Sequence, residues 1–259
     1  MPTNFLRWLR MILAMMLGAT LIALGTVNET QATVLIAPNA LATEEGNANN
    51  AAPFTFSSRY QQVFEASEFS SLSGLALITK ISFRPDAVFG QAFSATIPNI
   101  QISFSTTSAV PDELNPIFSN NTGSDNRLVF SGSLFLSSAF TGPAAGPKDF
   151  DVSVNLQNSF LYNPDDGNLL LDVKNFANNF SVAAFDAHNL VGDSLSRVWN
   201  DSDVNSDTAF FGSGNPNDFS NSLGLVTQFT FTPVTEPATL ALFSIGVLSL
   251  LGWRRNLTA

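Results

Sequence analysis

The chain has 259 residues, of which 11 are Lys or Arg, 21 are Asp or Glu, one is His and none is Cys, so its formal net charge is −10. The absence of Cys excludes a disulfide framework, a thiolate metal site and a Cys nucleophile. So acidic a chain is a poor binder of nucleic acid, because neutralising phosphates needs Lys and Arg. The hydrophobic content of 45% is typical of a folded protein.

Residues 1–32 follow the order of a secretory signal peptide. Arg7 and Arg10 form a short basic region, an apolar run extends over residues 11–27, and small residues lead up to Ala32. This order predicts passage through the secretion translocon and cleavage after Ala32. An uncleaved N-terminal anchor is the alternative, because the apolar run is close to the minimum length of a spanning helix, about 17 residues.

The middle of the chain predicts a spacer followed by one domain. Residues 33–53 contain the small, polar run EEGNANNAAP, which favours a flexible spacer. Within residues 54–233, apolar and polar side chains alternate with the period of a strand. The alternating runs lie at 100–105, 151–156, 169–174 and 228–232, and further strands are expected at 59–65, 75–84, 127–137, 181–186 and 194–199. Polar turns separate them, so we expect an all-β fold, a single jelly-roll-like β-sandwich.

An apolar segment close to the C-terminus predicts a transmembrane helix. Residues 238–253 read ATLALFSIGVLSLLGW without a charge, and Arg254 and Arg255 follow directly. The segment is apolar on every side, which favours a membrane helix over an amphipathic core helix. The two arginines are expected on the cytoplasmic side of the membrane, and Arg7 and Arg10 give the same orientation to the N-terminus. The middle of the chain would then lie outside the cytoplasm.

One acidic run has oxygen-bearing side chains at alternate positions, as in the opening of a calcium loop. These residues are Asp201, Asp203, Asn205 and Asp207. Ser206 stands where such a loop has its turn glycine, and Gly212 stands where it has a bidentate Glu. The alternatives are therefore a calcium site and an ordinary acidic surface loop, and Ca²⁺ is the only cofactor that the sequence suggests.

Catalytic constellations are weak in this sequence. His188 is the only possible base of a Ser-His-Asp triad, and no G-x-S-x-G motif accompanies it, which favours a surface or turn histidine. Asp165 and Asp166 are a carboxylate pair of the kind used in glycoside hydrolysis, but they lie in a Pro-Gly turn, which favours a solvated loop. We therefore expect no enzyme activity. Arg59 and Arg84 flank predicted strands and could form ion pairs across the sheet.

The C-terminal residues resemble a known sorting signal. Thr235-Glu236-Pro237-Ala238-Thr239, the apolar segment and Arg254-Arg255 are similar to the tripartite tail of PEP-CTERM proteins, exported proteins of cyanobacteria and other Gram-negative bacteria. Glu236 and Pro237 match the second and third positions of the family's Pro-Glu-Pro, and Thr235 departs from the first. The resemblance implies that a membrane enzyme, exosortase, is a partner of this chain and cuts near Glu236-Pro237.

Together these features predict a non-enzymatic protein of the cell surface or extracellular polymer matrix, with membrane contact only through its terminal segments. The first alternative is a carbohydrate-binding jelly roll, possibly assisted by calcium, that binds extracellular polysaccharide. Its candidate residues for stacking on sugar rings are the aromatic side chains of Tyr60, Tyr162 and Trp199. A hydrolase is the third alternative.

Overall fold

The computed structural model describes residues 31–72, 74–178, 181–212 and 222–234. They form one compact unit, Ala32–Pro233. Residues 1–30 of the predicted signal peptide, and the sorting tail from Thr235 with its apolar segment 238–253, lie outside the described residues. Within the part that is described, no helix is long and apolar enough to span a bilayer.

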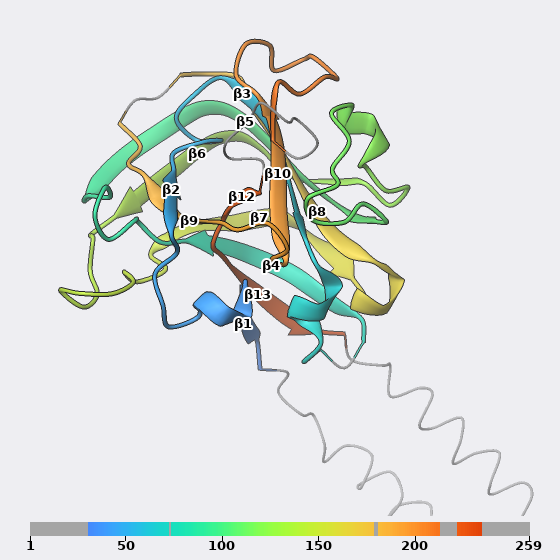
Figure 1. Cartoon of the computed structure of the whole chain (residues 1–259), viewed down its shortest axis with the longest axis horizontal. Helices are drawn as coiled ribbons and strands as arrows, with labels where there is room; N and C mark the ends of the chain where they lie inside the picture. Colours follow the sequence, from blue (N-terminus) through green and yellow to red (C-terminus); the bar gives the residue numbers. More distant parts are fainter. Residues whose placement is uncertain (1–30, 73, 179–180, 213–221, 235–259) are drawn as a thin grey trace, which may run out of the picture. The chain divides into compact units, whose positions relative to one another are not determined.

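The described chain is all-β, as predicted, and its strands form three sheets (Figure 1). The first sheet has the order β1 (Thr33–Ala37), β13 (Thr227–Pro233), β4 (Ala76–Phe83), β7 (Val152–Tyr162). The second has the order β11 (Phe211–Gly212), β10 (Leu195–Asn200), β3 (Ser58–Phe64), β8 (Asn168–Asn175), β5 (Phe93–Thr107), β6 (Arg127–Ser138). The third has the order β12 (Leu223–Leu225), β9 (Phe185–Asn189), β2 (Ala48–Asn50).

All strand pairs in these sheets are antiparallel. Four short 3₁₀ turns interrupt the described strands: η1 (Asn39–Leu41), η2 (Ala66–Phe69), η3 (Phe118–Asn120) and η4 (Pro164–Asp166). Side chains join edge strands β6 and β7, because the Gln157 amide both accepts from and donates to the backbone of Ser131 at 3.0 Å. The two larger sheets are therefore linked at one margin.

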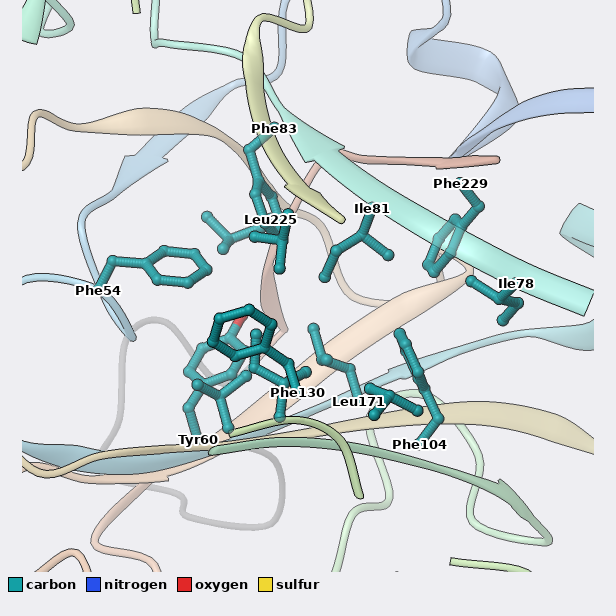
Figure 2. Close-up of a cluster of buried hydrophobic side chains, with 14 of the residues drawn as sticks. Phe54, Tyr60, Ile78, Ile81, Phe83, Phe104, Phe130, Leu171, Leu225 and Phe229 are labelled. Atoms are coloured by element: carbon teal, nitrogen blue, oxygen red, sulfur yellow. The ribbon is translucent and has the colours of Figure 1, made fainter. Parts of the chain in front are cut away.

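The two larger sheets pack face to face around an aromatic core (Figure 2). Phe229 of β13 makes an edge-to-face contact with Phe64 of β3, with ring centroids 5.0 Å apart, and its ring centroid lies 6.3 Å from that of Phe104 of β5. All three side chains are fully buried. Aromatic rings bury large apolar areas and prefer such tilted or edge-on arrangements, which explains the use of Phe at inward positions.

The predicted alternation is confirmed in β13, where Phe229 and Phe231 are buried and the threonines between and after them are half-exposed. Strand β8 shows why an uninterrupted apolar run also occurs. Leu169, Leu171 and Val173 face the main core, whereas Leu170 belongs to a second, smaller core on the opposite face of the sheet. The segments that carry Leu114, Phe118 and Ala209 contribute to this second core.

The predicted spacer at residues 33–53 is wrong. Thr33–Ala37 is strand β1, paired with β13, and Ala48–Asn50 is strand β2, paired with β9. Ala37 and Leu41 are buried. The polar run that suggested a spacer lies between and around these two strands. The residues TVLIA favour a strand and pair along their backbone with β13, so β1 forms despite the polar composition of the segment. The folded domain therefore begins about twenty residues earlier than predicted, at Ala32 instead of residue 54.

Most of the other expected strands are present, with small shifts. The strand predicted at 181–186 is β9 at Phe185–Asn189, whereas the short strands β11 and β12 were not predicted. Both are too short to show a period. Strand β12 is held by β9, and β11 is held by β10, so tertiary pairing defines them.

Candidate functional site

Both ends of the folded domain lie at one place in the first sheet. Strand β1 begins at Thr33, and Thr33 is the antiparallel partner of Phe231 in β13, which ends at Pro233. The predicted signal-peptide cleavage after Ala32 would thus fall next to the first residue of β1. The sorting residues Glu236, Pro237, Arg254 and Arg255 lie outside the described residues, beyond the end of β13. Neither predicted cleavage would remove a residue of these two strands.

The predicted calcium loop follows β10 and packs beside η3. Its last member, Asp207, is engaged by protein groups: Arg59 Nη1 lies 3.1 Å from Asp207 Oδ1, and the Ser119 backbone N–H donates to the same oxygen at 3.0 Å. The hydrogen bonds from Ser119, followed by the Arg59 guanidinium, hold the pKa of Asp207 below its ordinary value, despite a smaller opposing effect of burial. Asp207 thus has a structural role.

The other members of the loop organise its backbone. Asp203 accepts a hydrogen bond from the Asn205 N–H at 2.8 Å, and Asp201 accepts one from the Ser202 hydroxyl at 3.3 Å. Both Asp201 and Asp203 are exposed. These are the local turn contacts that Asp and Asn commonly make. A calcium site formed by Asp201, Asp203, Asn205 and Asp207 stays a prediction.

His188 lies on β9 and pairs with Asp193, with Nδ1 2.7 Å from the carboxylate oxygen Oδ2. Burial raises the pKa of Asp193, and hydrogen bonds from Leu195 and His188 oppose that effect. Among the described residues, no serine hydroxyl contacts the imidazole.

The aromatic candidates for sugar stacking are wrong for Tyr60 and Tyr162. Both side chains are fully buried, and Figure 2 shows Tyr60 within the hydrophobic cluster. Trp199 is partly buried, and its ring lies over that of Phe211 with a centroid distance of 5.2 Å. The Arg197 guanidinium lies over the Trp199 ring, 4.9 Å from its centroid. Sequence could not separate these core aromatics from exposed ones.

A polar cleft of about 340 Å³ opens between the ends of strands from both larger sheets. Its polar lining is Thr106, Asp125, Arg127, Asn163 and Asp166, and its apolar lining is Leu75, Phe160 and Leu161. The Thr106 N–H donates to Asp125 at 2.8 Å, and the Asn163 side chain donates to Asp166 at 3.1 Å. Arg127 is exposed, and no described residue bonds to its guanidinium. The cleft therefore offers carboxylate, amide and guanidinium groups to a ligand.

A second polar site is buried where three segments meet. Arg84 follows β4 and is 1% exposed, and Asp186 on β9 is 0% exposed. Arg84 Nε donates to Asp186 Oδ2 at 2.6 Å, and Arg84 Nη2 donates to the backbone carbonyl groups of Leu41 and Glu44. Arg84 thus connects the N-terminal segment to the sandwich and confirms the expected ion pair for this residue.

Two further carboxylates join this pair. Oxygen atoms of Glu45, Asp86 and Asp186 lie within 4.8 Å of one another, and no other such group of three is found among the described residues. Asp86 is 6% exposed, and its Oδ1 accepts from the N–H groups of Val88 and Phe89. Burial raises the pKa of Asp186 to about 6; Arg84 opposes this effect and Glu45 adds to it.

Sequence reasoning missed this cluster. Asp86 lies in Arg84-Pro85-Asp86 at a strand end, Glu45 lies in the supposed spacer, and Asp186 precedes His188 by two positions. A glycine beside Glu45 is consistent with this close contact, because Gly46 packs directly against β9. A Cβ atom at Gly46 would collide with the Ala187 carbonyl and the Asp186 carboxylate, so only glycine fits there.

A family model for the PEP-CTERM protein-sorting motif matches residues 233–256. The match includes the predicted sorting residues Glu236, Pro237, Arg254 and Arg255, and it begins at Pro233, the last residue of β13. Comparison of the chain with curated proteins and with solved structures finds no match. The resemblance seen in the sequence is thereby confirmed, and the chain is a protein with a PEP-CTERM sorting tail.

Proposed function

We propose that this chain is a non-enzymatic protein of the cell surface or extracellular polymer matrix, freed from an inner-membrane intermediate when exosortase cuts its tail. The motif at residues 233–256 marks it as an exported protein processed by exosortase. The observation that carries the finer proposal is the position of that motif, which starts where β13 ends. Cleavage near Glu236-Pro237 would leave the whole domain intact.

The chemistry of the tail supports this division of roles. Pro237 has a fixed φ and no N–H, so a helix can start at it without losing a hydrogen bond. Glu236 would then lie beside the positive N-terminal end of that helix. The apolar residues hold the segment in the bilayer, and Arg254 and Arg255 keep its end in the cytoplasm. The intermediate therefore presents Glu236-Pro237 at the outer face of the membrane.

Fractionation of a Gram-negative host that contains an exosortase tests this proposal. We expect the full chain to yield a shortened, released protein, whereas the double variant Glu236→Ala/Pro237→Ala accumulates in the membrane fraction at its unprocessed length. Thr235→Ala is the matched control, because Thr235 already departs from the family pattern, and it should be processed as well as the native chain. Equal release of the double variant would refute the proposed use of the tail.

Binding of extracellular polysaccharide is the second candidate function. The chain crosses between the two larger sheets from β3 to β4 to β5 and again from β6 to β7 to β8, which supports a jelly-roll-like interpretation, a fold that includes lectin domains. The polar cleft supports it further, because its size of about 340 Å³ is at the lower end of small-molecule sites. Asp125, Asn163 and the unengaged Arg127 are groups that hydrogen-bond to sugar hydroxyls.

Affinity electrophoresis of the full chain in gels containing the host's extracellular polysaccharide tests this candidate. Retardation that is lost in Arg127→Gln but kept in Lys174→Gln, a charge-matched variant of a half-exposed residue on β8, would support binding at the cleft. Equal mobility with and without polysaccharide would remove the candidate.

The hydrolase alternative receives less support from the same cleft. A glycosidase needs two carboxyl groups with different environments, one of them in an apolar pocket that keeps it protonated. Asp125 and Asp166 both line the cleft, but both are exposed to solvent. Their arrangement therefore favours ligand binding over acid catalysis.

A further inference from the structure

We propose that Glu45, Asp86 and Asp186 form a calcium site that fastens the N-terminal segment to the β-sandwich. The three carboxylates come from three separate parts of the chain: the loop between η1 and β2, the turn after β4, and strand β9. Backbone hydrogen bonds hold two of these parts together, because Asp86 N–H donates to Ala184 and Asp186 N–H donates to Arg84.

One carboxylate oxygen in the cluster is buried without a donor. Glu45 Oε2 has no solvent contact and accepts no hydrogen bond, although Glu45 Oε1 accepts from the Ala87 N–H at 2.7 Å. Asp86 is more than nine-tenths buried, and it accepts from Val88 and Phe89 through Oδ1 alone, which leaves Oδ2 available to a ligand. An ionised oxygen buried without a partner is costly, and a bound cation removes that cost.

The charge of the cluster is also unbalanced. Three carboxylates face one guanidinium, and that guanidinium is already shared between Asp186 and two backbone carbonyl groups. The Phe150 ring packs against one face of the guanidinium, with its centroid 4.9 Å from the guanidinium carbon. With all three carboxyls ionised, the net charge is −2, which one divalent cation neutralises.

The origin of the ligands favours calcium over magnesium. The cluster's oxygens lie within 4.8 Å of one another, which is compatible with one cation between them. Ca²⁺ accepts irregular arrangements of oxygen ligands, such as carboxylates from three separate segments, whereas Mg²⁺ demands near-ideal octahedral geometry. An all-oxygen donor set is also the one that hard cations prefer. Three protein ligands leave positions for water, which is typical of a site of moderate affinity.

Calorimetric titration of CaCl₂ into the full, metal-stripped chain in detergent micelles tests the site, with thermal unfolding measured in parallel. We expect one Ca²⁺ per chain with a Kd of about 10⁻⁴–10⁻³ M, the range of extracellular modules, and weaker binding of MgCl₂. Saturating Ca²⁺ should raise the Tm, because the ion binds only the assembled cluster.

Glu45→Gln separates ion binding from a purely structural role. The amide keeps an oxygen for the Ala87 N–H and removes one of the three like charges. In chelator, this variant should therefore unfold at the same temperature as the native chain or higher, while its calcium affinity falls roughly 10-fold or more. Asp203→Asn is the matched control in the exposed acidic loop and should bind Ca²⁺ as the native chain does.

Absence of binding up to about 10 mM Ca²⁺, well above the weakest of such sites, would overturn the proposal. Loss of binding in Asp203→Asn with full retention in Glu45→Gln would overturn it too, and would assign the ion to the loop at Asp201–Asp207. A native chain whose Tm is the same in calcium and in chelator would contradict the fastening role.

Discussion

Two acidic regions of this chain, the cluster of Glu45, Asp86 and Asp186 and the loop from Asp201 to Asp207, solve the same electrostatic problem differently. The loop is exposed, so solvent screens its charges. Of its three aspartates, Asp207 is the one that forms an ion pair, with Arg59. The cluster is buried, and Arg84 balances only part of its charge. A solvent-exposed carboxylate pays little desolvation free energy and attracts cations only weakly, whereas a buried carboxylate requires a positively charged or hydrogen-bonding partner. The buried region is therefore where substitution, and a cation, should matter most.

The largest effect should come from Arg84→Met. Removing the guanidinium leaves Asp186 buried without its positive partner and leaves two carbonyl groups without a donor. Breaking one side of a buried ion pair costs about 3–5 kcal/mol. Urea unfolding of the native and variant chains measures that loss. Arg59→Met removes the partner of the half-exposed Asp207 and of Asp172, which keeps the Gln61 amide as a donor. It should therefore cost less than Arg84→Met, and an equal loss would erase the distinction between the two regions.

The segment that carries Glu45 supplies the next largest effect. Ala37 and Val34 lie on the same strand, β1, but Ala37 is 1% exposed and Val34 is 51% exposed. Ala37→Asp buries an unpaired carboxylate against the core and should lower the free energy of unfolding by about 3 kcal/mol or more. Val34→Asp should change it by less than about 0.5 kcal/mol. If both variants proved equally stable, residues 33–37 would behave as the spacer that the composition suggested.

The smallest effect should come from Asp207→Asn. The pKa of Asp207 is lowered in the folded state, so its carboxylate stabilises the fold above the ordinary value of 3.8, and that contribution is lost as the pH falls through the lower, folded-state pKa. Because the side chain is 48% exposed, the loss at neutral pH should be under about 1 kcal/mol. Urea unfolding at neutral pH and well below pH 3.8 should show the difference and then its disappearance. A difference that persists in acid would contradict the assigned cause, and Asp201→Asn serves as the exposed control.

The sequence predicts those features whose signal is local. Alternation such as that around Phe229 and Phe231 reveals a strand, because successive side chains point to the buried and the exposed face in turn. The tail is recognisable because Glu236, Pro237 and the arginines stand in a fixed order. The acidic cluster has no local signature, since its members are separated by 41 residues between Glu45 and Asp86 and by 100 between Asp86 and Asp186. Contacts between distant segments bring them together, among them the pairing of β2 with β9 and the bridge between Pro85 and Phe185.

The burial of Tyr60 and Tyr162 teaches the same lesson from the other direction. The residue type alone does not show whether an aromatic side chain belongs to a core or to a binding surface, because that depends on the face of the strand to which the side chain points. The composition of residues 33–53 also led to a wrong prediction. The five residues of β1 hardly change the composition of a segment rich in Asn and Ala, yet all five pair with β13.

Intact-mass measurement of the protein recovered from host cells with and without exosortase tests the central claim most directly, namely that the domain at Ala32–Pro233 is exported and then separated from its sorting tail. We predict a product in exosortase-containing cells that begins at Thr33 and ends near Glu236, and a longer, membrane-retained product in cells without the enzyme. A single mass that includes residues 238–259 in both hosts would contradict the account.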